Sequence, residues 1–162
     1  MFDEIGKNLE VFETEKVLYV IPNLEYHKGF LKNALVNLVV TDQRIIVAHV
    51  KKEMIQKARE EAKERGDGFF KRLASGWTMH ERYYDMSPEE VLKEAPENFS
   101  IPLREIKEIK LKGGNVDEGK KEEMEIKWKE KSKFSGNMNQ REIKKKLSDL
   151  GVKVKGGSLF GF

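Results

Sequence analysis

The sequence predicts an α+β fold in which antiparallel strands form a small barrel or bent sheet, with inserted helices and a C-terminal helix. Two β-rich apolar runs, residues 35–40 and 45–50, are separated by four polar residues, a pattern typical of a hairpin. Apolar and charged residues alternate again at 109–112 and 123–129. Residues 139–151 carry a helical period. The predicted order is therefore strands, inserted helices, strands and a final helix.

The first strands are predicted from residues 17–31. An unbroken apolar run over 17–21 ends at Pro22, which cannot donate to a strand ladder, so we expect the first strand to stop there. A second strand is expected over residues 25–31. The hairpin that follows is apolar almost throughout, which indicates burial on both faces or coverage by another element.

A helical insertion is predicted over residues 51–96. Met54, Ile55, Ala58 and Ala62 have the spacing of a narrow apolar helix stripe, which Gly66-Asp67-Gly68 interrupts. Further helices follow over residues 68–84 and from 87 onward. The last of these has a strong start signal, because Ser87 and Glu90 have the spacing of a capping box and proline suits the first helical position.

The final helix is predicted from an Asn139 cap with Glu142 three residues later. Ile143, Leu147 and Leu150 give it one apolar face, and Gly151 follows its last turn. We expect one domain over residues 1–155 and a flexible tail over 156–162, which is rich in apolar residues for a chain end.

The composition limits the classes of function. The 162 residues carry a formal net charge of only +3, so charge alone does not require a nucleic acid partner. Residues 1–50 hold 5 basic and 7 acidic side chains, whereas residues 104–162 hold 16 basic and 10 acidic ones. Cysteine is absent, which excludes disulfides and thiolate sites. With no signal-like start and no apolar run of ~20 residues, we expect a cytoplasmic protein; the abundance of Lys and Glu is thermophile-like.

No catalytic constellation is visible in the sequence. His27, His49 and His80 do not have metal-ligand spacing, and each is interpreted as structural. The paired glutamates lie on predicted solvated surfaces, and the Gly-Gly pairs lack the lysine and helix of a phosphate loop. We therefore expect a protein that is not an enzyme and has no metal or other cofactor.

Three short motifs carry a family resemblance. They are Glu15-Lys16-Val17-Leu18, Leu38-Val39-Val40-Thr41-Asp42-Gln43-Arg44-Ile45-Ile46-Val47, and Ile101-Pro102-Leu103-Arg104-Glu105-Ile106. In these segments the chain resembles the pleckstrin-homology-like superfamily, particularly bacterial and archaeal PH and GRAM-type domains. The resemblance implies a bent, partly open antiparallel β-barrel of about seven strands, with one end closed by the C-terminal helix. The helical insertion departs from a minimal domain of this family.

The resemblance constrains function only broadly, because the superfamily includes phosphoinositide readers, peptide binders and self-assembling modules. Thr41, Asp42 and Arg44 are expected to shape the hairpin. Arg44 at the hairpin mouth has two interpretations: contact with an anionic ligand, or, as we favour, a salt bridge or backbone contact that fixes the turn.

The candidate interaction surface lies in the insertion. It consists of Phe69, Phe70, Lys71, Arg72, Leu73 and Trp77. Such a composition occurs in helices that lie at a membrane interface, but also in helices that cover a sheet or associate with another subunit.

The alternation of lysines 127, 129, 131 and 133 with Trp128 and Phe134 resembles a nucleic-acid surface, yet we interpret it as the outer face of a strand. The expected function is a non-enzymatic interaction module with a protein partner or a homo-oligomeric assembly. Peripheral binding to an anionic membrane is the alternative, and nucleic acid is the less favoured partner.

Overall fold

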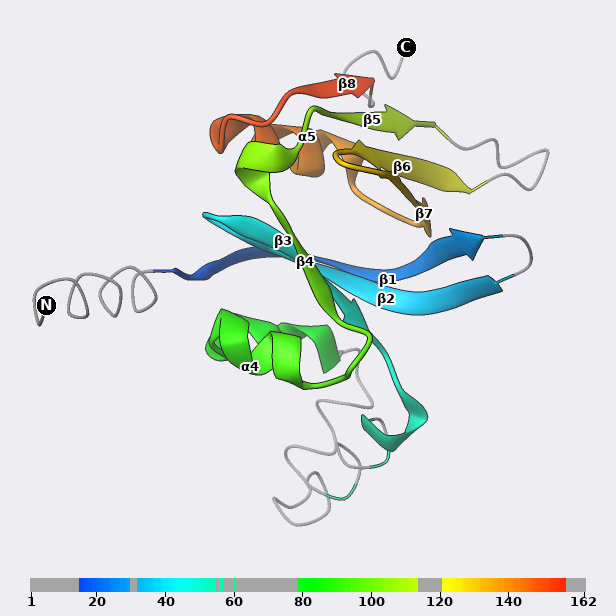
Figure 1. The fold of residues 1–162 in the computed structure, drawn as a ribbon, viewed down its shortest axis with the longest axis vertical. Helices are drawn as coiled ribbons and strands as arrows, with labels where there is room; N and C mark the ends of the chain where they lie inside the picture. Colours follow the sequence, from blue (N-terminus) through cyan, green and yellow to red (C-terminus); the bar gives the residue numbers. More distant parts are fainter. Residues whose placement is uncertain are drawn as a thin grey trace, which may run out of the picture.

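The computed structural model describes residues 15–29, 32–54, 56, 60, 79–113 and 121–156. These residues form one eight-stranded mixed sheet with strand order β4-β3-β2-β1-β7-β6-β5-β8 (Figure 1). All neighbouring strands are antiparallel except β5 and β8, which are parallel. The strands are β1 (Val17–Gly29), β2 (Lys32–Thr41), β3 (Arg44–His49), β4 (Phe99–Pro102), β5 (Glu108–Lys112), β6 (Glu122–Lys127), β7 (Lys131–Gly136) and β8 (Val154–Gly156).

The sheet divides into two halves at the junction of β1 with β7. Only two register pairs join these strands, Glu25 with Ser135 and Tyr26 with Phe134. The β5–β8 half and the β1–β4 half lie one above the other in Figure 1. Their facing apolar side chains form the main core together with α5 (Gln140–Asp149), whose Ile143 and Leu147 are fully buried. This core excludes water between the halves and supplies most of the apolar burial.

A second apolar layer covers the other face of β1–β3. Val39 and Ile46 pack there with Tyr83 of the 3-10 helix η1 (Met79–Asp85) and Val91 of α4 (Pro88–Lys93). The hairpin of β2 and β3 is therefore buried on both faces, as its apolar sequence predicted. The predicted capping box of α4 is confirmed, since Ser87 and Glu90 exchange side-chain and backbone hydrogen bonds.

The predicted PH-like barrel of about seven antiparallel strands with a large helical insertion is wrong. The sheet is open and mixed: β4 and β8 stand at its two ends and do not pair with each other. Closure requires the end strands to pair. Here β4 ends at Pro102, which has no N–H to donate, while β8 adds to β5 in parallel orientation. In the described part of residues 51–96, the helical residues are 52–54, 56 and 60, η1 and α4.

The strand boundaries near Pro22 also differ from the prediction. Strand β1 continues through Pro22 to Gly29, so residues 25–29 are its second half and not a separate strand. The register with β2 shifts between Ile21 and Leu24, where Asn23 adopts a φ of 57°. Such a bulge accommodates a proline without ending the strand.

Several other elements agree with the sequence. The C-terminal helix begins after Asn139, whose side chain accepts a hydrogen bond from the Glu142 N–H, and Gly151 follows it with a φ of 86°. Strands β5 and β6 match the two alternating segments, although Trp128 lies in the turn after β6. Strand β8 was not predicted. Of the predicted tail over 156–162, Gly156 is the last residue of β8, and residues 157–162 lie outside the described residues.

Candidate functional site

A largely buried ion pair lies at the turn of the β2–β3 hairpin. The guanidinium of Arg44 donates two hydrogen bonds to the Glu15 carboxylate, at 2.8 and 3.0 Å, and one to Glu89 at 2.9 Å. The Thr41 hydroxyl donates to the same Glu15 carboxylate at 2.7 Å and accepts from the backbone N–H of Gln43 and Arg44. Since Arg44 is engaged by two carboxylates, this geometry gives it a structural contact and leaves it poorly placed to bind an anion.

The other predicted site residues fall in two groups. Asp42 is exposed, and its carboxylate accepts a hydrogen bond from the Lys16 N–H at 3.4 Å. The candidate interaction surface over residues 69–73 and 77 lies outside the described residues. Tyr84, which follows that segment, is exposed and accepts a hydrogen bond through its hydroxyl from the Val20 N–H at 3.1 Å.

Strand β4 provides a hollowed edge that the sequence did not reveal. Two cavities, of about 550 and 430 Å³, are both lined by Ser100 and Pro102. The larger one also contacts Asp42, Arg104 and the chain after α5, including Leu150 and Val152. The smaller one reaches the turn between β6 and β7, at residues 128–130. Ligand pockets in proteins have volumes of this order.

Three aromatic side chains line the smaller cavity. The ring of Phe99 lies parallel to that of Trp128, with centroids 6.3 Å apart, and 5.8 Å from the ring of Tyr26. The Trp128 indole N–H donates to the Ser132 hydroxyl, which fixes the ring. The Lys129 ammonium lies 4.9 Å from the centre of the indole. The cavity therefore offers apolar, polarisable walls beside the ammonium group of a long lysine side chain.

The backbone of β4 is paired on one side only. Leu103 donates its N–H to the Gln43 carbonyl, and the next alternate residues of β4, Ile101 and Phe99, are in register with Ile45 and Val47. In an antiparallel ladder, the residues between such pairs direct their N–H and C=O groups away from the partner strand. Ser100 thus turns its backbone donor and acceptor toward the outer edge, between the two cavities. An extended chain could add to the sheet at this position.

A buried histidine lies behind the aromatic wall. His49 meets the Tyr26 ring edge-on, with centroids 6.2 Å apart, and neither of its ring nitrogens has a hydrogen-bond partner in the structure. Burial, reinforced by the Lys28 ammonium, lowers the pKa of His49. Burial also raises the pKa of Tyr26. Both rings are therefore neutral near pH 7 and form an uncharged inner wall.

One serine and one histidine have the contacts of a nucleophile and a base. His27 makes hydrogen bonds to Ser135 at 2.9 Å and to Asn33 at 3.1 Å. However, Ser135 is in register with Glu25 on one side and Glu123 on the other. Two carboxylates at cross-strand distance oppose the negative charge that develops in acyl transfer. This arrangement is better suited to joining β1 with β7.

The described residues also bear on metal sites and membrane-spanning helices. Within the described ranges, no group of three or more His, Asp or Glu residues could hold a metal ion. None of the helices in the described part of the chain is long and apolar enough to cross a membrane.

Comparisons with known proteins add little to this geometry. No family model matches the chain, and no curated protein matches it. A solved structure, the C-terminal domain of an unknown protein from Leishmania infantum, is similar at 16% identity and a TM-score of 0.46. That similarity covers 93% of this chain and 98% of the other.

The sequence offered only indirect signals for the β4 edge. Pro102 ends a short strand, and the Trp128 side chain ends the β6 alternation at a turn. Neither pattern reveals that the two segments meet, because the contact joins opposite halves of the sheet.

Proposed function

We propose that this chain is a non-enzymatic protein-association module that binds an extended peptide segment at the outer edge of β4. The observation that carries the proposal is the position of Ser100: its backbone donor and acceptor face outward between two cavities. An added strand gains affinity from backbone hydrogen bonds and specificity from side-chain pockets.

The cavities define the peptide that fits. Successive side chains of an added strand point to opposite faces of the sheet, so every second side chain can enter one of the two cavities. The smaller cavity, with its aromatic walls, suits an apolar or aromatic side chain, which would pack on Phe99 and Tyr26. The larger cavity offers the charged Asp42 and Arg104 beside apolar Leu103 and Val152. We therefore expect a peptide with an apolar anchor at one end and a polar residue toward the other.

The segment can belong to another protein or to a second copy of this chain. A second copy would present its own β4 edge around a two-fold axis, which is the usual symmetry of homodimers. Peripheral binding to anionic membrane through Phe69, Phe70, Lys71, Arg72 and Trp77 stays a hypothesis, since these residues lie outside the described ranges.

Selection from a phage-displayed library of random ten-residue peptides tests the proposal. Selected peptides titrated into the isotope-labelled protein should shift the amide signals of residues 99–102 and the Trp128 indole. Ser100→Pro removes the outward N–H but suits an edge strand, and it should weaken binding about tenfold. Ser100→Ala, which keeps the N–H, should bind within about twofold of the wild type.

Light scattering over a concentration series separates the two kinds of partner. If a second copy occupies the edge, the wild type dimerises and Ser100→Pro is monomeric. Peptides that perturb a different face, together with equal binding by Ser100→Pro and Ser100→Ala, would contradict the β4 site.

A further inference from the structure

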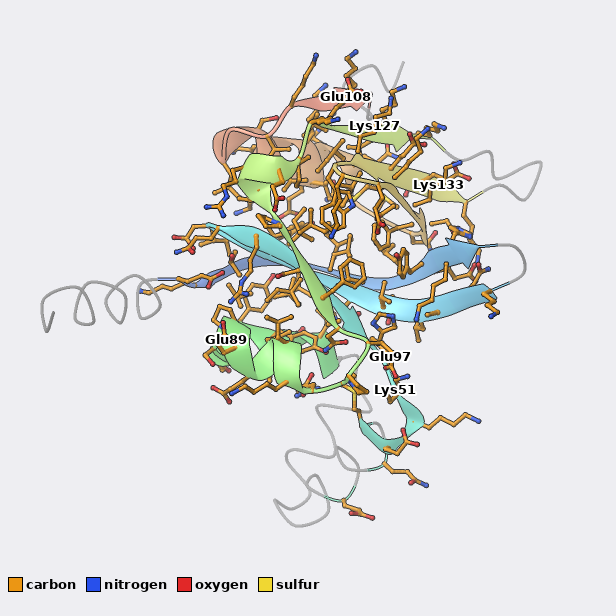
Figure 2. All side chains as sticks on the ribbon, viewed as in Figure 1. Lys51, Glu89, Glu97, Glu108, Lys127 and Lys133 are labelled. Atoms are coloured by element: carbon orange, nitrogen blue, oxygen red, sulfur yellow. The ribbon has the colours of Figure 1, made fainter. Side chains whose placement is uncertain are left out.

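The outer face of the β5–β8 half is built almost entirely from lysine and glutamate. Strand register places Lys133, Glu125, Lys110 and Lys155 in one row across β7, β6, β5 and β8. Adjacent rows contain Lys131, Lys127 and Glu108, and Ser135, Glu123 and Lys112. We call the six lysines of these rows, residues 110, 112, 127, 131, 133 and 155, the lysine face. Glu108, Lys127 and Lys133 are labelled on this half in Figure 2.

The ammonium groups form the outermost layer of this face. Glu125 lies at its centre with only 7% of its side chain exposed, and it pairs with Lys112 and Lys131 at 3.7 Å each. Glu108, 12% exposed, pairs with Lys127 and Lys155. The lysines Lys131 and Lys155 are each 56% exposed. An approaching partner therefore meets the ammonium groups before it meets these two carboxylates.

Positive charge also exceeds negative charge on the face. Six lysines accompany three glutamates, and neither Lys110 nor Lys133 forms an ion pair in the described part of the chain. The adjacent Lys127 ammonium lowers the pKa of Lys110, as expected when two like charges are held together. Exposed ion pairs add little to stability, so the ion pairs of this face do not account for its surplus of lysine. The excess of lysine instead matches a partner that brings several negative charges.

The chemistry of the face favours phosphate groups over a membrane. Among the outward residues of these rows, all are charged except Ser135, so none supplies an apolar anchor for a bilayer interface. Stable membrane attachment usually combines basic residues with such an anchor. A phosphodiester chain needs only repeated cations, and lysine binds phosphate as a point charge.

We propose that the lysine face binds the phosphate backbone of a nucleic acid without reading its bases. The aromatic side chains of this half, Trp128 and Phe134, point into the core, so they do not stack on bases. The proposal goes beyond the peptide site at β4 and does not depend on it. It also revises the sequence-based preference against nucleic acid, because Lys110, Lys112 and Lys155 join the 127–133 run only through strand pairing.

Fluorescence anisotropy with labelled 20-nucleotide poly(U) and poly(dT) tests the proposal at 50 to 200 mM salt. Both probes should bind, since backbone contact does not distinguish bases. Six lysine contacts would give a slope of log K against log salt of about −4 for a single strand. The triple variant Lys110→Gln/Lys131→Gln/Lys133→Gln should reduce the slope to about −2 and weaken binding at least tenfold at 50 mM salt.

A matched control removes the same charge elsewhere. Lys16, Lys32 and Lys93 are exposed on the β1–β4 half or on α4, and their triple Gln variant should bind within about twofold of the wild type. Glu123→Gln provides a test in the opposite direction. Glu123 is exposed within the face, so its neutralisation should tighten binding and leave the thermal midpoint close to that of the wild type.

The competing partners are tested in the same series. Polyglutamate and vesicles with 30% phosphatidylserine serve as the acidic-protein and membrane probes. The nucleic-acid assignment is overturned if either of them binds as tightly as poly(U), if poly(U) fails to bind at 50 mM salt, or if both triple variants lose affinity equally. Loss of affinity confined to the lysine-face variant, with a gain for Glu123→Gln, supports it even if the peptide site at β4 proves wrong.

Discussion

Glu15 and Arg44, 29 residues apart, form a two-hydrogen-bond ion pair that joins the segment before β1 to the start of β3. The Glu15 side chain is only 2% exposed, and the Arg44 side chain 16%. Because water is largely excluded, neither charge can be solvated easily when the other is removed. The pair therefore specifies where the chain enters the sheet, whatever its net contribution to stability.

Removal of one partner of the Glu15–Arg44 pair should lower the free energy of unfolding more than removal of both. Glu15→Leu leaves Arg44 with only the exposed Glu89 and also deprives Thr41 of its acceptor, so we expect a loss of about 2–4 kcal/mol in unfolding free energy. The double variant Glu15→Leu/Arg44→Met should recover part of that loss. Urea denaturation of the wild type, both single variants and the double variant measures the coupling. Additive losses would show that the pair acts as two independent surface charges.

His49 should make the protein less stable in mild acid. Burial lowers the pKa of His49 in the folded state, so the unfolded chain binds a proton more readily as the pH falls below about 6.5. The free energy of unfolding should therefore decrease as the pH falls below that value, because protonation of His49 favours the unfolded chain. The charged groups that act on the ring are Lys28 and Lys51, which also disfavour the imidazolium, and Glu97, which favours it.

His49→Phe isolates this effect. Phenylalanine keeps a ring against Tyr26 and removes two buried nitrogens that lack hydrogen-bond partners. The unfolding free energy of the variant should vary less than that of the wild type between pH 7 and pH 5. Burial lowers the pKa of His80 as well, so some pH dependence should remain. Identical pH profiles for the two proteins would exclude His49 as a source of acid sensitivity.

The sequence predicted elements whose causes are local. The β2–β3 hairpin follows from two apolar runs around polar residues, and the starts of α4 and α5 follow from Ser87 and Asn139 at their caps. Pro22 was misleading, because a bulge beside it lets β1 continue. The N–H that Pro22 lacks is not needed for pairing with β7, because β7 pairs only with the later part of the strand.

The remaining features depend on contacts between distant segments. No local pattern reveals that Phe99 will stack against Trp128, or that Glu15 will pair with Arg44. Strand β8 has only three residues, and its place in the sheet depends on pairing with β5, which is distant in sequence. Sheet closure depends on whether the end strands meet, and motifs within single strands do not encode that. The open edge of β4 therefore became visible only in the structure.

Asn98 should be one of the most sensitive polar residues outside the core. Its amide donates to the Val91 carbonyl at 2.9 Å and its oxygen accepts from the His49 N–H at 2.7 Å, so it joins α4 to the end of β3. Asn98→Ala should cost about 1–3 kcal/mol, since both backbone groups lose a partner. Asn33→Ala, at an exposed position, is the control and should cost less. Chemical denaturation measures both, and equal losses would contradict the bridging role.

Gly156 should tolerate no larger residue. It adopts a φ of +80°, and a Cβ atom built there would lie 2.1 Å from the carbonyl oxygen of Leu111, a backbone atom on the neighbouring strand. Gly156→Ala should therefore separate β8 from β5 and raise amide hydrogen exchange in both strands, because the backbone must shift. Gly151 has a similar φ of +86° but open space around its Cβ position. Gly151→Ala should carry only the conformational cost, of about 1 kcal/mol, and leave exchange in β5 unchanged. If amide hydrogen exchange in β5 and β8 is the same in both variants, close packing against Leu111 is not what requires glycine at position 156.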